Sequence, residues 1–357
     1  MKYPELLQFD EVLPRLDQFD AIIDARSPSE YALDHLPGAI NCPVLDDAER
    51  ILVGTTYKQV GAFEAKKMGA AIVAKNIARH LETVWRDEPR EWTPLVYCWR
   101  GGNRSGAMAH ILAKVGWPVV QLDGGYKAYR QHVNAALETA PALDLRVLCG
   151  TTGSGKSRLL QTLDGIGAQV LDLEQLAAHR GSVLGHIPSV PQPSQKAFES
   201  AIWDRLRRFD AGQPVFVESE SKKVGNVRVP AALMGAMRGA PCIALELARE
   251  DRVRLLMAEY AHFTSEPAAL NGQLDCLALL HGREKIAHWQ ALANAGRMDD
   301  LVDALLAEHY DPAYLKSIDR NFTQHGQARV LALGGIGPGD FAAAAHSLHA
   351  AGAPART

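Results

Sequence analysis

The sequence predicts an α/β protein built from two domains, each with a parallel sheet. The chain has 357 residues, and this length suggests about two domains. Short apolar runs alternate with stretches of helical spacing, as in sheets whose parallel strands are joined by helices. A glycine-rich loop follows an apolar run near the middle of the chain, and this position indicates where the second sheet begins.

The first domain is expected to span 1–135. Its predicted strands are 20–24, 35–43 after an initial turn, 94–98 and 119–125, and its predicted helices are 63–85 and 105–116. Gly116 ends the second helix, with Pro118 just beyond it. Residues 136–144 carry no clear strand pattern, so we assign them to a linker.

The second domain is expected to span 145–325. Its predicted strands are 145–149, 169–173, 214–219 and 241–247, and residues 249–316 are mostly helical in pattern. The segment 326–357 is rich in Gly and Ala at its end. We assign it to a C-terminal tail, in which a last helix with a frayed end is expected.

Composition and charge restrict the function. Hydrophobic residues make up 47% of the chain and charged residues 22%, the balance of a globular protein in water. The net charge of −3 excludes a surface that coats nucleic acid, so any RNA contact requires a local basic patch. No run of about 18 apolar residues occurs and the N-terminus is unlike a secretory signal, so no membrane contact is expected. The five cysteines are widely spaced without a CxxC pair, which favours a reducing compartment, and we expect the cytoplasm.

The sequence Cys98–Ser105, CWRGGNRS, places a cysteine at the end of a predicted strand and just before a helix. Two glycines let backbone N–H groups turn inward, and the helix N-terminus adds positive partial charge, so the loop is suited to an anion. The same field favours the thiolate of Cys98, which is the nucleophilic form, and Ser105 is the expected helix N-cap. The other four cysteines lack such surroundings and are expected in the core. The candidate catalytic residues are Cys98, Arg100 and Arg104, with Trp99, Gly101 and Gly102 as further site candidates.

Four motifs of the first domain resemble those of rhodanese-type domains. They are Asp24–Ser27 with Glu30-Tyr31, His35–Asn41, the cysteine loop and Leu122–Tyr129, in the family's order over about residues 5–130. The resemblance implies a rhodanese-like fold in which Cys98 carries sulfur or selenium as a persulfide-like adduct. The spacing from Cys98 to Arg104 is C-x5-R, one residue longer than in the short rhodanese loop and similar to phosphatase loops. A wider loop suits a larger oxyanion such as selenophosphate or phosphate, so a phosphatase remains an alternative.

Residues Gly150–Ser157, GTTGSGKS, match the phosphate-loop (P-loop) pattern G-x-x-x-x-G-K-[ST] in full, between a predicted strand and a predicted helix. Backbone N–H groups would cradle a phosphate chain, Lys156 would reach its terminal phosphates, and Ser157 would be a ligand of Mg2+ if a metal is used. The expected phosphate-binding residues are Gly150, Thr151, Thr152, Gly153, Ser154, Gly155, Lys156 and Ser157. The second domain is therefore expected to be P-loop NTPase-like.

Further candidates lie in loops of the second domain. No apolar strand ends in a single acidic residue of the kind that completes an ATPase site, so the sequence indicates a site for a diphosphate without indicating nucleotide hydrolysis. The stretches 179–185, 192–199 and 218–226 are expected near the carboxyl ends of strands, where open α/β sheets bind ligands. A solvated surface loop is the alternative for each. The site candidates from these stretches are Arg180, Lys196, Glu218, Lys222 and Lys223, with Arg228 just beyond them.

The cysteine loop, the P-loop and the stretches HRGSxLG, QPxQKxFE and VExES together resemble the tRNA 2-selenouridine synthase family over about residues 5–320. The resemblance implies an enzyme that acts on tRNA with 2-thiouridine at the wobble position. It implies geranyl diphosphate as alkylating substrate, selenophosphate as selenium donor with selenophosphate synthetase as its source, and no tightly bound cofactor. We expect geranyl diphosphate at the P-loop and selenium transfer near Cys98. A rhodanese-type sulfurtransferase or a C-x5-R phosphatase, coupled to a P-loop ATPase or kinase, remains the alternative, and a non-catalytic anion-binding module is a third possibility.

Overall fold

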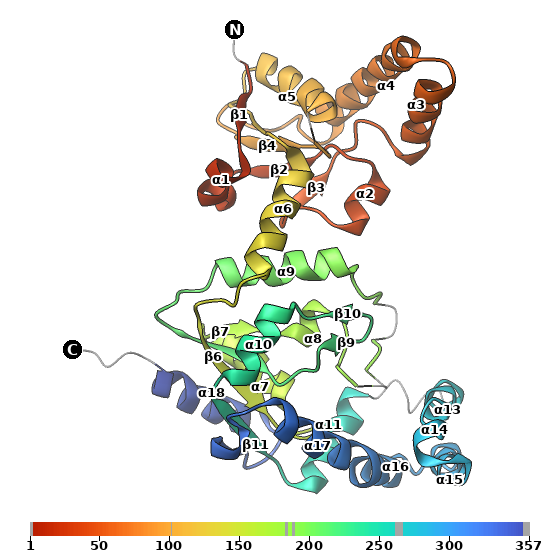
Figure 1. Cartoon of the computed structure of the whole chain (residues 1–357), viewed down its shortest axis with the longest axis vertical. Helices are drawn as coiled ribbons and strands as arrows, with labels where there is room; N and C mark the ends of the chain where they lie inside the picture. The colour runs from red at the N-terminus through yellow and green to blue at the C-terminus, as the bar shows by residue number, and fades with distance from the viewer. Residues whose placement is uncertain (1–2, 101, 183–184, 188–189, 261–266, 353–357) are drawn as a thin grey trace, which may run out of the picture. The chain divides into compact units, whose positions relative to one another are not determined.

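The computed structural model describes residues 3–352 except 101, 183–184, 188–189 and 261–266. The chain divides into two compact units (Figure 1). The N-terminal unit consists of Met1–Glu138 with Pro193–Asp204, and the C-terminal unit of Thr139–Gln192 with Arg205–Thr357. Each unit contains a parallel sheet with helices, so the predicted α/β class is confirmed.

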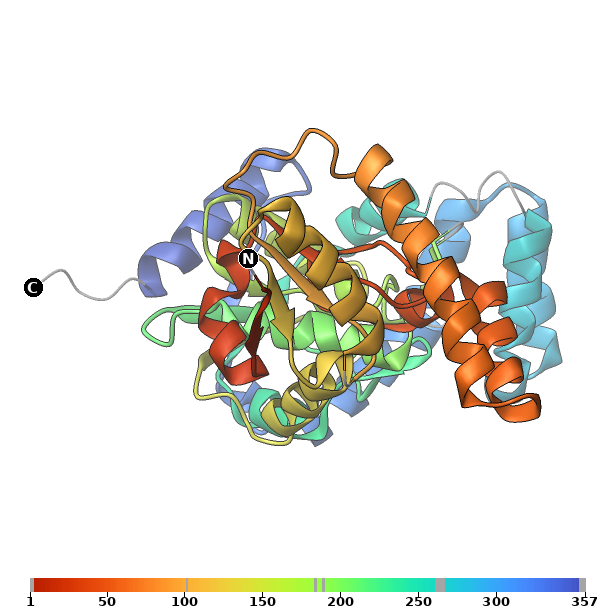
Figure 2. The ribbon, with the colours of Figure 1, turned by 90° about the horizontal axis from the view of Figure 1, so that it is seen from above.

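In the described part of the N-terminal unit, five strands form one parallel sheet. Their order across the sheet is β1 (Glu5–Leu7), β5 (Val120–Leu122), β4 (Pro94–Tyr97), β2 (Ala21–Asp24) and β3 (Ala39–Asn41). All but β1 lie within predicted strands. The helices are α1 (Phe9–Val12), η1 (Leu13–Gln18), α2 (Pro28–Leu33), α3 (Asp47–Gln59), α4 (Ala62–Thr83), α5 (Asn103–Val115), α6 (Gly125–Leu137) and α9 (Gln195–Arg207). Figures 1 and 2 show α3 and α4 side by side, as a helical hairpin.

Aromatic packing brings the segment Pro193–Asp204 into the N-terminal unit. Trp203 of α9 is 4% exposed, and its ring packs edge-on against Tyr129 of α6 with 5.5 Å between the ring centroids. Arg130, also on α6, forms an ion pair with Glu199 of α9. Because a buried tryptophan removes a large apolar area from water, this contact holds α9 on the N-terminal unit. The sequence pattern alone places α9 in the second domain.

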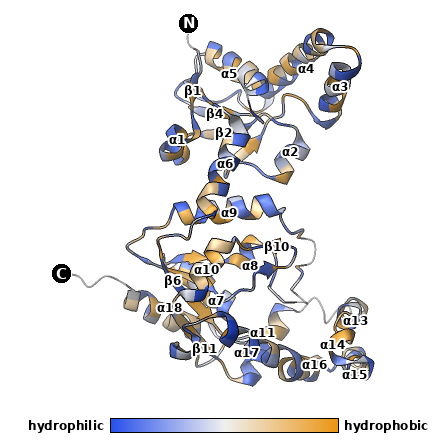
Figure 3. Ribbon diagram, in the orientation of Figure 1, coloured by the Kyte–Doolittle hydropathy of each residue, from blue (hydrophilic) through white to orange (hydrophobic). Residues whose placement is uncertain are grey.

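Five strands also form the parallel sheet in the described part of the C-terminal unit. Their order is β12 (Arg329–Ala332), β11 (Cys242–Glu246), β6 (Asp144–Cys149), β8 (Pro214–Glu218) and β7 (Gln169–Leu171), and a separate antiparallel hairpin consists of β9 (Lys223–Val224) and β10 (Val227–Arg228). The helices are α7 (Lys156–Gly165), α8 (Leu173–Leu176), α10 (Ala231–Gly239), α11 (Arg249–Glu259), α13 (Pro267–Asp275), α14 (Ala278–His281), α15 (Arg283–Asn294), α16 (Met298–Leu305), η2 (Leu306–Tyr310), α17 (Asp311–Asn321), η3 (His325–Gln327) and α18 (Pro338–Gly352). Figure 3 shows hydrophobic residues along the strands of this sheet.

The segment 326–357 contributes an edge strand and a helix to the C-terminal unit rather than forming a separate tail. β12 pairs in parallel with β11, with Val330 opposite Ala244. Phe341 and Leu348 of α18 are buried in the same core cluster as Leu163 of α7. Because most residues at the end of this segment are Gly or Ala, the sequence shows no clear apolar pattern for these few contacts. The contacts nevertheless hold the segment on the sheet.

The helices that follow β11 build a second core of their own. Trp289 of α15 is fully buried among apolar residues of α13 and α16, including Leu274 and Leu301. The predicted helical character of 249–316 thus corresponds, in the described residues, to a helical part with its own core. Among the helices within the described ranges, none has both the length and the apolar character needed to cross a bilayer.

Candidate functional site

Cys98 of the N-terminal unit directly follows β4, as predicted. Cys98 is 2% exposed, and its sulfur accepts a hydrogen bond from the hydroxyl of Ser105 at 3.3 Å. The thiol also lies 3.6 Å from the carbonyl oxygen of Arg100. The prediction that Ser105 is the N-cap of α5 was wrong, because Gly102 takes that position and Ser105 lies in the first turn. The serine hydroxyl instead fixes the sulfur and supplies a donor to a negatively charged sulfur.

Gly102 meets two structural requirements at the start of α5. Its backbone has φ of 77°, in the left-handed region that glycine adopts without strain. A Cβ atom at this position would also lie 2.5 Å from the side-chain nitrogen of Gln121. That nitrogen donates to the Ser105 hydroxyl at 3.4 Å, so the glycine leaves room for a chain of contacts to Cys98. Gly101 lies outside the described residues.

The N-terminus of α6 holds the cysteine loop from the other side. The backbone N–H of Tyr126 donates to the carbonyl oxygen of Cys98 at 2.7 Å, and the backbone N–H of Lys127 donates to the carbonyl oxygen of Trp99 at 3.0 Å. Gly125 allows this approach, because a Cβ there would lie 2.3 Å from the carbonyl oxygen of Cys98. The indole of Trp99 stacks on the Tyr126 ring, with 5.4 Å between centroids, and remains 41% exposed. An exposed aromatic face beside the nucleophile is suited to stacking on a nucleobase.

The two predicted arginines of the cysteine loop have different surroundings. Arg104 donates to both carboxylate oxygens of Glu30, at 2.7 and 3.3 Å, and Arg50 lies 3.3 Å from the same carboxylate. Burial opposes the charge of Glu30, but the hydrogen bond and charge of Arg104 hold the pKa of this carboxyl below its ordinary value. Arg104 therefore ties α5 to α2, while Arg100 is exposed and only its carbonyl oxygen is shown near the Cys98 sulfur.

The P-loop of the C-terminal unit connects β6 to α7, as predicted. Gly155 is the N-cap of α7 with φ of 87°, and a Cβ there would lie 2.7 Å from the Phe341 ring. The ammonium of Lys156 donates to the carbonyl oxygen of Gly150 at 2.6 Å, so it folds back over the loop. The hydroxyl of Ser154 is buried without a hydrogen-bond partner among the described residues. Lys156 and the loop backbone thus frame one anion site at the start of the helix.

Two residues far along the chain anchor this loop, and sequence reasoning did not assign them a role in the site. Arg252 of α11 donates to the carbonyl oxygen of Thr152 at 2.7 and 3.0 Å and pairs with Asp311 at 2.6 Å. The hydroxyl of Tyr314 on α17 accepts a hydrogen bond from the backbone N–H of Gly150 at 2.6 Å. In the sequence, Arg252 belongs to a cluster of arginines on a helix that is typical of a solvated face, so no sequence signal identified it.

A pocket of about 760 Å³ opens over the P-loop. Residues 152–157 line it, together with Arg180 and Lys222 from two of the three stretches selected from the sequence, 179–185 and 218–226. Gly150 and Thr151 form the end of the loop nearest the strand and are not among the lining residues. The pocket therefore joins the P-loop to both stretches, as their predicted places at strand ends require. Val183 and Leu184, within the first of these stretches, lie outside the described residues.

The remaining predicted cations lie in different places. Arg180 donates to the carbonyl oxygen of Glu259 at 2.7 Å. Lys223 and Arg228 are exposed and stand opposite each other in the β9–β10 hairpin, next to Lys222, so the three form one basic patch. The prediction that 192–199 forms a loop at the ligand crevice was wrong, because the helix α9 begins at Gln195 and belongs to the N-terminal unit up to Asp204. Lys196 lies on this helix and is not among the residues that line the P-loop pocket.

Carboxyl groups surround Lys156, and burial changes how they titrate. Burial lowers the pKa of Lys156, although the charges of Glu174 and Glu220 oppose this shift. Burial, with the charge of Glu174, raises the pKa of Glu220 to about 8. Glu218, at the end of β8, is buried beside Asp172, and its pKa lies well above the ordinary value. Glu220 is therefore largely protonated at neutral pH, which limits its repulsion of a phosphate group.

The predicted role of Ser157 toward Mg2+ depends on its neighbours. The Ser157 hydroxyl donates to Glu174 at 3.0 Å. Within the described ranges, no three His, Cys, Asp or Glu side chains are close enough together to hold a metal ion. A Mg2+ ion at Ser157 would have the Glu174 carboxylate beside it and would take further oxygen ligands from a bound phosphate chain and water, an arrangement that this ion commonly adopts.

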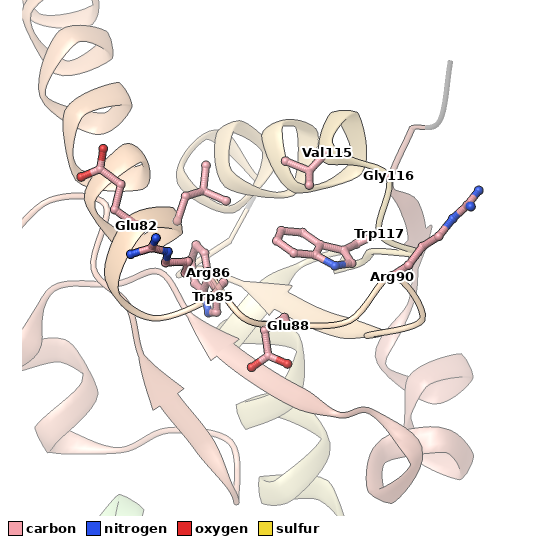
Figure 4. Close-up of a pocket in the computed structure, with 9 residues that line it drawn as sticks. Glu82, Trp85, Arg86, Glu88, Arg90, Val115, Gly116 and Trp117 are labelled. Atoms are coloured by element: carbon pink, nitrogen blue, oxygen red, sulfur yellow. The ribbon is translucent and has the colours of Figure 1, made fainter.

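A separate hollow of about 590 Å³ lies at the ends of α4 and α5 in the N-terminal unit (Figure 4). Figure 4 shows the Trp117 indole near Val115, with the Arg90 side chain extending away from the ring. The hollow contains none of the residues of the cysteine loop. We assign it no function.

Comparison with known proteins gives the two units different matches. The family described as the rhodanese-like domain matches residues 8–132, and the one described as the tRNA 2-selenouridine synthase AAA domain matches residues 143–276. A tRNA 2-selenouridine synthase from Hydrogenovibrio crunogenus is 33% identical over 339 residues, which cover 85% of this chain and 92% of the relative. This chain belongs to the tRNA 2-selenouridine synthase family. The family resemblance predicted from the sequence is therefore confirmed.

Other members of the tRNA 2-selenouridine synthase family match over shorter regions. The relative from Nitrosomonas europaea is 37% identical over 247 residues, which cover 67% of this chain and 63% of the relative, so the chain spans less than two thirds of that relative's length. Among solved structures, the N-terminal domain of a putative ATP/GTP binding protein from Clostridium difficile 630 is 34% identical, with a TM-score of 0.31. That match covers 36% of this chain and 98% of the other.

Proposed function

We propose that this chain is an enzyme that converts wobble 2-thiouridine in tRNA to 2-selenouridine. Membership of the family supports the reaction. The observation that carries the proposal is the presence, in one chain, of a cysteine held by Ser105 at a helix N-terminus and of a P-loop whose Lys156 and Ser157 are intact. A non-catalytic module would not require both sets of groups.

We propose geranyl diphosphate as the substrate of the first step, at the P-loop. The thiocarbonyl sulfur of 2-thiouridine attacks the first carbon of the geranyl chain, the carbon–oxygen bond breaks, and diphosphate leaves. The proton on the uracil nitrogen is lost to solvent. Lys156 and the N–H groups of the loop stabilise the negative charge that develops on the diphosphate. Alkylation converts a poor leaving group into a good one.

We propose selenophosphate as the donor in the second step, at the cysteine loop. Selenium attacks the carbon that bears the S-geranyl group, geranyl thiol leaves, and the phosphorus–selenium bond is cleaved by water to give phosphate. The cysteine loop orients the donor through its backbone N–H groups and Arg100. Selenophosphate synthetase is the proposed source of the donor, and the cytoplasm the proposed compartment. A C-x5-R phosphatase is less well supported, because Arg104 is bound to Glu30.

The nucleosides of bulk tRNA provide the direct test. Mass spectrometry of digested tRNA from cells with and without this protein should show 2-selenouridine only when the protein is present. Both cultures are supplemented with selenium, so that a missing 2-selenouridine signal cannot result from a shortage of the selenium donor. If 2-selenouridine persists in the absence of the protein, another enzyme makes it and the proposal is wrong.

The basic patch of Lys222, Lys223 and Arg228 is the proposed tRNA contact beside the P-loop pocket. With a net charge of −3, the protein cannot hold tRNA by diffuse attraction. Replacing all three residues with alanine should weaken binding about equally for every tRNA. It should also lower the log–log salt slope by about one for each phosphate group that the patch neutralises. Titration of labelled tRNA at several salt concentrations measures both quantities. Unchanged slope and affinity would identify these residues as a solvated turn.

Glu220→Gln is expected to remove part of the pH dependence of diphosphate binding. Because the pKa of Glu220 is raised to about 8, its carboxyl is mostly neutral at pH 7 and becomes charged as the pH rises through this value. The new negative charge beside Lys156 opposes a bound phosphate. Between pH 7 and pH 9, wild type should therefore lose about tenfold more affinity for inorganic diphosphate than the variant. Calorimetric titrations at both pH values measure this difference, and the variant corrects for the ionisation of diphosphate itself. Equal losses of affinity in wild type and variant would show that Glu220 does not titrate beside the bound diphosphate.

A further inference from the structure

An apolar chamber adjoins the phosphate pocket of the C-terminal unit. Its volume is about 70 Å³. Its lining is almost wholly hydrophobic and comes from α11, α13, α16 and η2, with a few residues shared with the phosphate pocket. The residues that line only the chamber are Met257, Leu270, Met298, Leu301, Val302, Leu305 and Leu306.

The two cavities share a boundary. Thr152 of the P-loop, Ser182, Leu256, Tyr260 and Tyr310 line both of them. A molecule whose anionic end occupies the P-loop is thus within reach of the chamber without leaving this unit. The carbonyl oxygen of Thr152 at this boundary already accepts two hydrogen bonds from the Arg252 guanidinium.

The backbone at this boundary is unusual. Residues Leu306–Tyr310 form a π-helical turn between α16 and α17, and such turns are rare and occur frequently at functional sites. The turn places Leu306 in the chamber lining and His309 in the lining of the phosphate pocket, with Tyr310 in both. The π-helical turn therefore supplies lining residues to both cavities.

We infer that the chamber binds the hydrocarbon chain of a prenyl diphosphate whose diphosphate group lies on the P-loop. This inference deepens the proposed function and rests on it for the identity of the headgroup. Burial of a hydrocarbon chain against leucine and methionine side chains is favourable and needs no polar partner. A nucleobase would leave its polar edge without partners in such a lining, which disfavours a nucleotide. Met257 and Met298 are unbranched, so their side chains adapt readily to the length of a chain.

A series of diphosphates tests the inference on the purified full chain. Inorganic diphosphate, dimethylallyl diphosphate, geranyl diphosphate and ATP are titrated into the protein by calorimetry. Each buried methylene strengthens binding by about fourfold, so geranyl diphosphate should bind more than about a hundredfold more tightly than inorganic diphosphate. Equal affinity along the prenyl series, or tighter binding of ATP than of geranyl diphosphate, would overturn the inference.

Two variants test where the hydrocarbon chain binds. Val302→Phe fills the chamber at a half-buried position. It should lower the affinity for geranyl diphosphate about tenfold, while the affinity for inorganic diphosphate should change by less than about twofold. Val330→Phe makes the same change at a position that is 57% exposed on β12 and serves as the matched control. Met298→Ala enlarges the chamber and should shift preference toward farnesyl diphosphate, a gain that a damaged fold would not produce. Loss of inorganic diphosphate binding in parallel, with no gain for farnesyl diphosphate, would contradict the assignment.

Geranylation of 2-thiouridine tRNA, measured on the same proteins, separates the two proposals. If wild type geranylates tRNA but Val302→Phe keeps the wild-type KM for geranyl diphosphate, the chamber assignment fails and the proposed function stands. If geranyl diphosphate binds in the chamber but no S-geranyl nucleoside forms, the chamber stands and the proposed function fails.

Discussion

Replacing Lys156 with alanine should lower the rate of S-geranyl nucleoside formation by about a hundredfold or more, the usual effect of removing one charge contact to a transition state. The Lys156 ammonium lies 2.6 Å from the carbonyl oxygen of Gly150, within the phosphate pocket. It is the cation best placed to neutralise a departing diphosphate. Incubation of the variant with 2-thiouridine tRNA and geranyl diphosphate, followed by nucleoside mass spectrometry, measures the rate.

Two controls accompany this variant. Lys316→Ala removes an exposed lysine from α17, the helix that carries Tyr314, and should geranylate at the wild-type rate. Selenium transfer to tRNA that already carries the S-geranyl group should persist in Lys156→Ala, because that step does not release diphosphate. A variant that geranylates normally would remove the P-loop from the first step.

Cys98→Ser should abolish selenium incorporation while geranylation continues. Cys98 lies at the proposed donor site, and serine keeps the size of the thiol but does not form an anion at neutral pH. The measurement is the ratio of S-geranyl-2-thiouridine to 2-selenouridine after incubation with both substrates, and the S-geranyl nucleoside should accumulate. Cys276→Ser is the matched control, because Cys276 is exposed, whereas the prediction that it lies in the core was wrong and holds only for Cys42, Cys149 and Cys242. Loss of geranylation in a folded Cys98→Ser protein would show that the two loops do not divide the reaction in this way.

The sequence predicted the strands of the two parallel sheets except two edge strands, β1 and β12. β4 and β8 are fully buried, and apart from Glu218 at the end of β8 they have the apolar character from which both were predicted. β1 and β12 are edge strands with mostly exposed residues, so neither has an apolar pattern to detect. The place of α9 depends on Trp203 contacting Tyr129, a contact between distant positions that no local pattern encodes.

For the site as well, continuous motifs were predicted from the sequence, whereas residues distant in the chain were not. The loops that contain Cys98 and Lys156 are continuous motifs, and each lies between a strand and a helix as predicted. Arg252 and Tyr314 bind P-loop residues that lie 100 and 164 positions before them in the chain, so only the folded structure identifies them. The N-cap error arose because serine and glycine are both acceptable N-caps, and the left-handed φ of Gly102 decided between them.

The return of α9 to the N-terminal unit has a consequence for dissection of the enzyme. Because Pro193–Asp204 interrupts the C-terminal unit, the polypeptide passes between the two units three times, after residues 138, 192 and 204. A fragment that stops at residue 138 lacks Trp203 and leaves the aromatic rings of Phe9 and Tyr129 uncovered. Such a fragment is therefore expected to aggregate, and a single proteolytic cut between the units would leave the halves associated. Studies of the isolated rhodanese-like half need the α9 segment joined back through a short flexible linker.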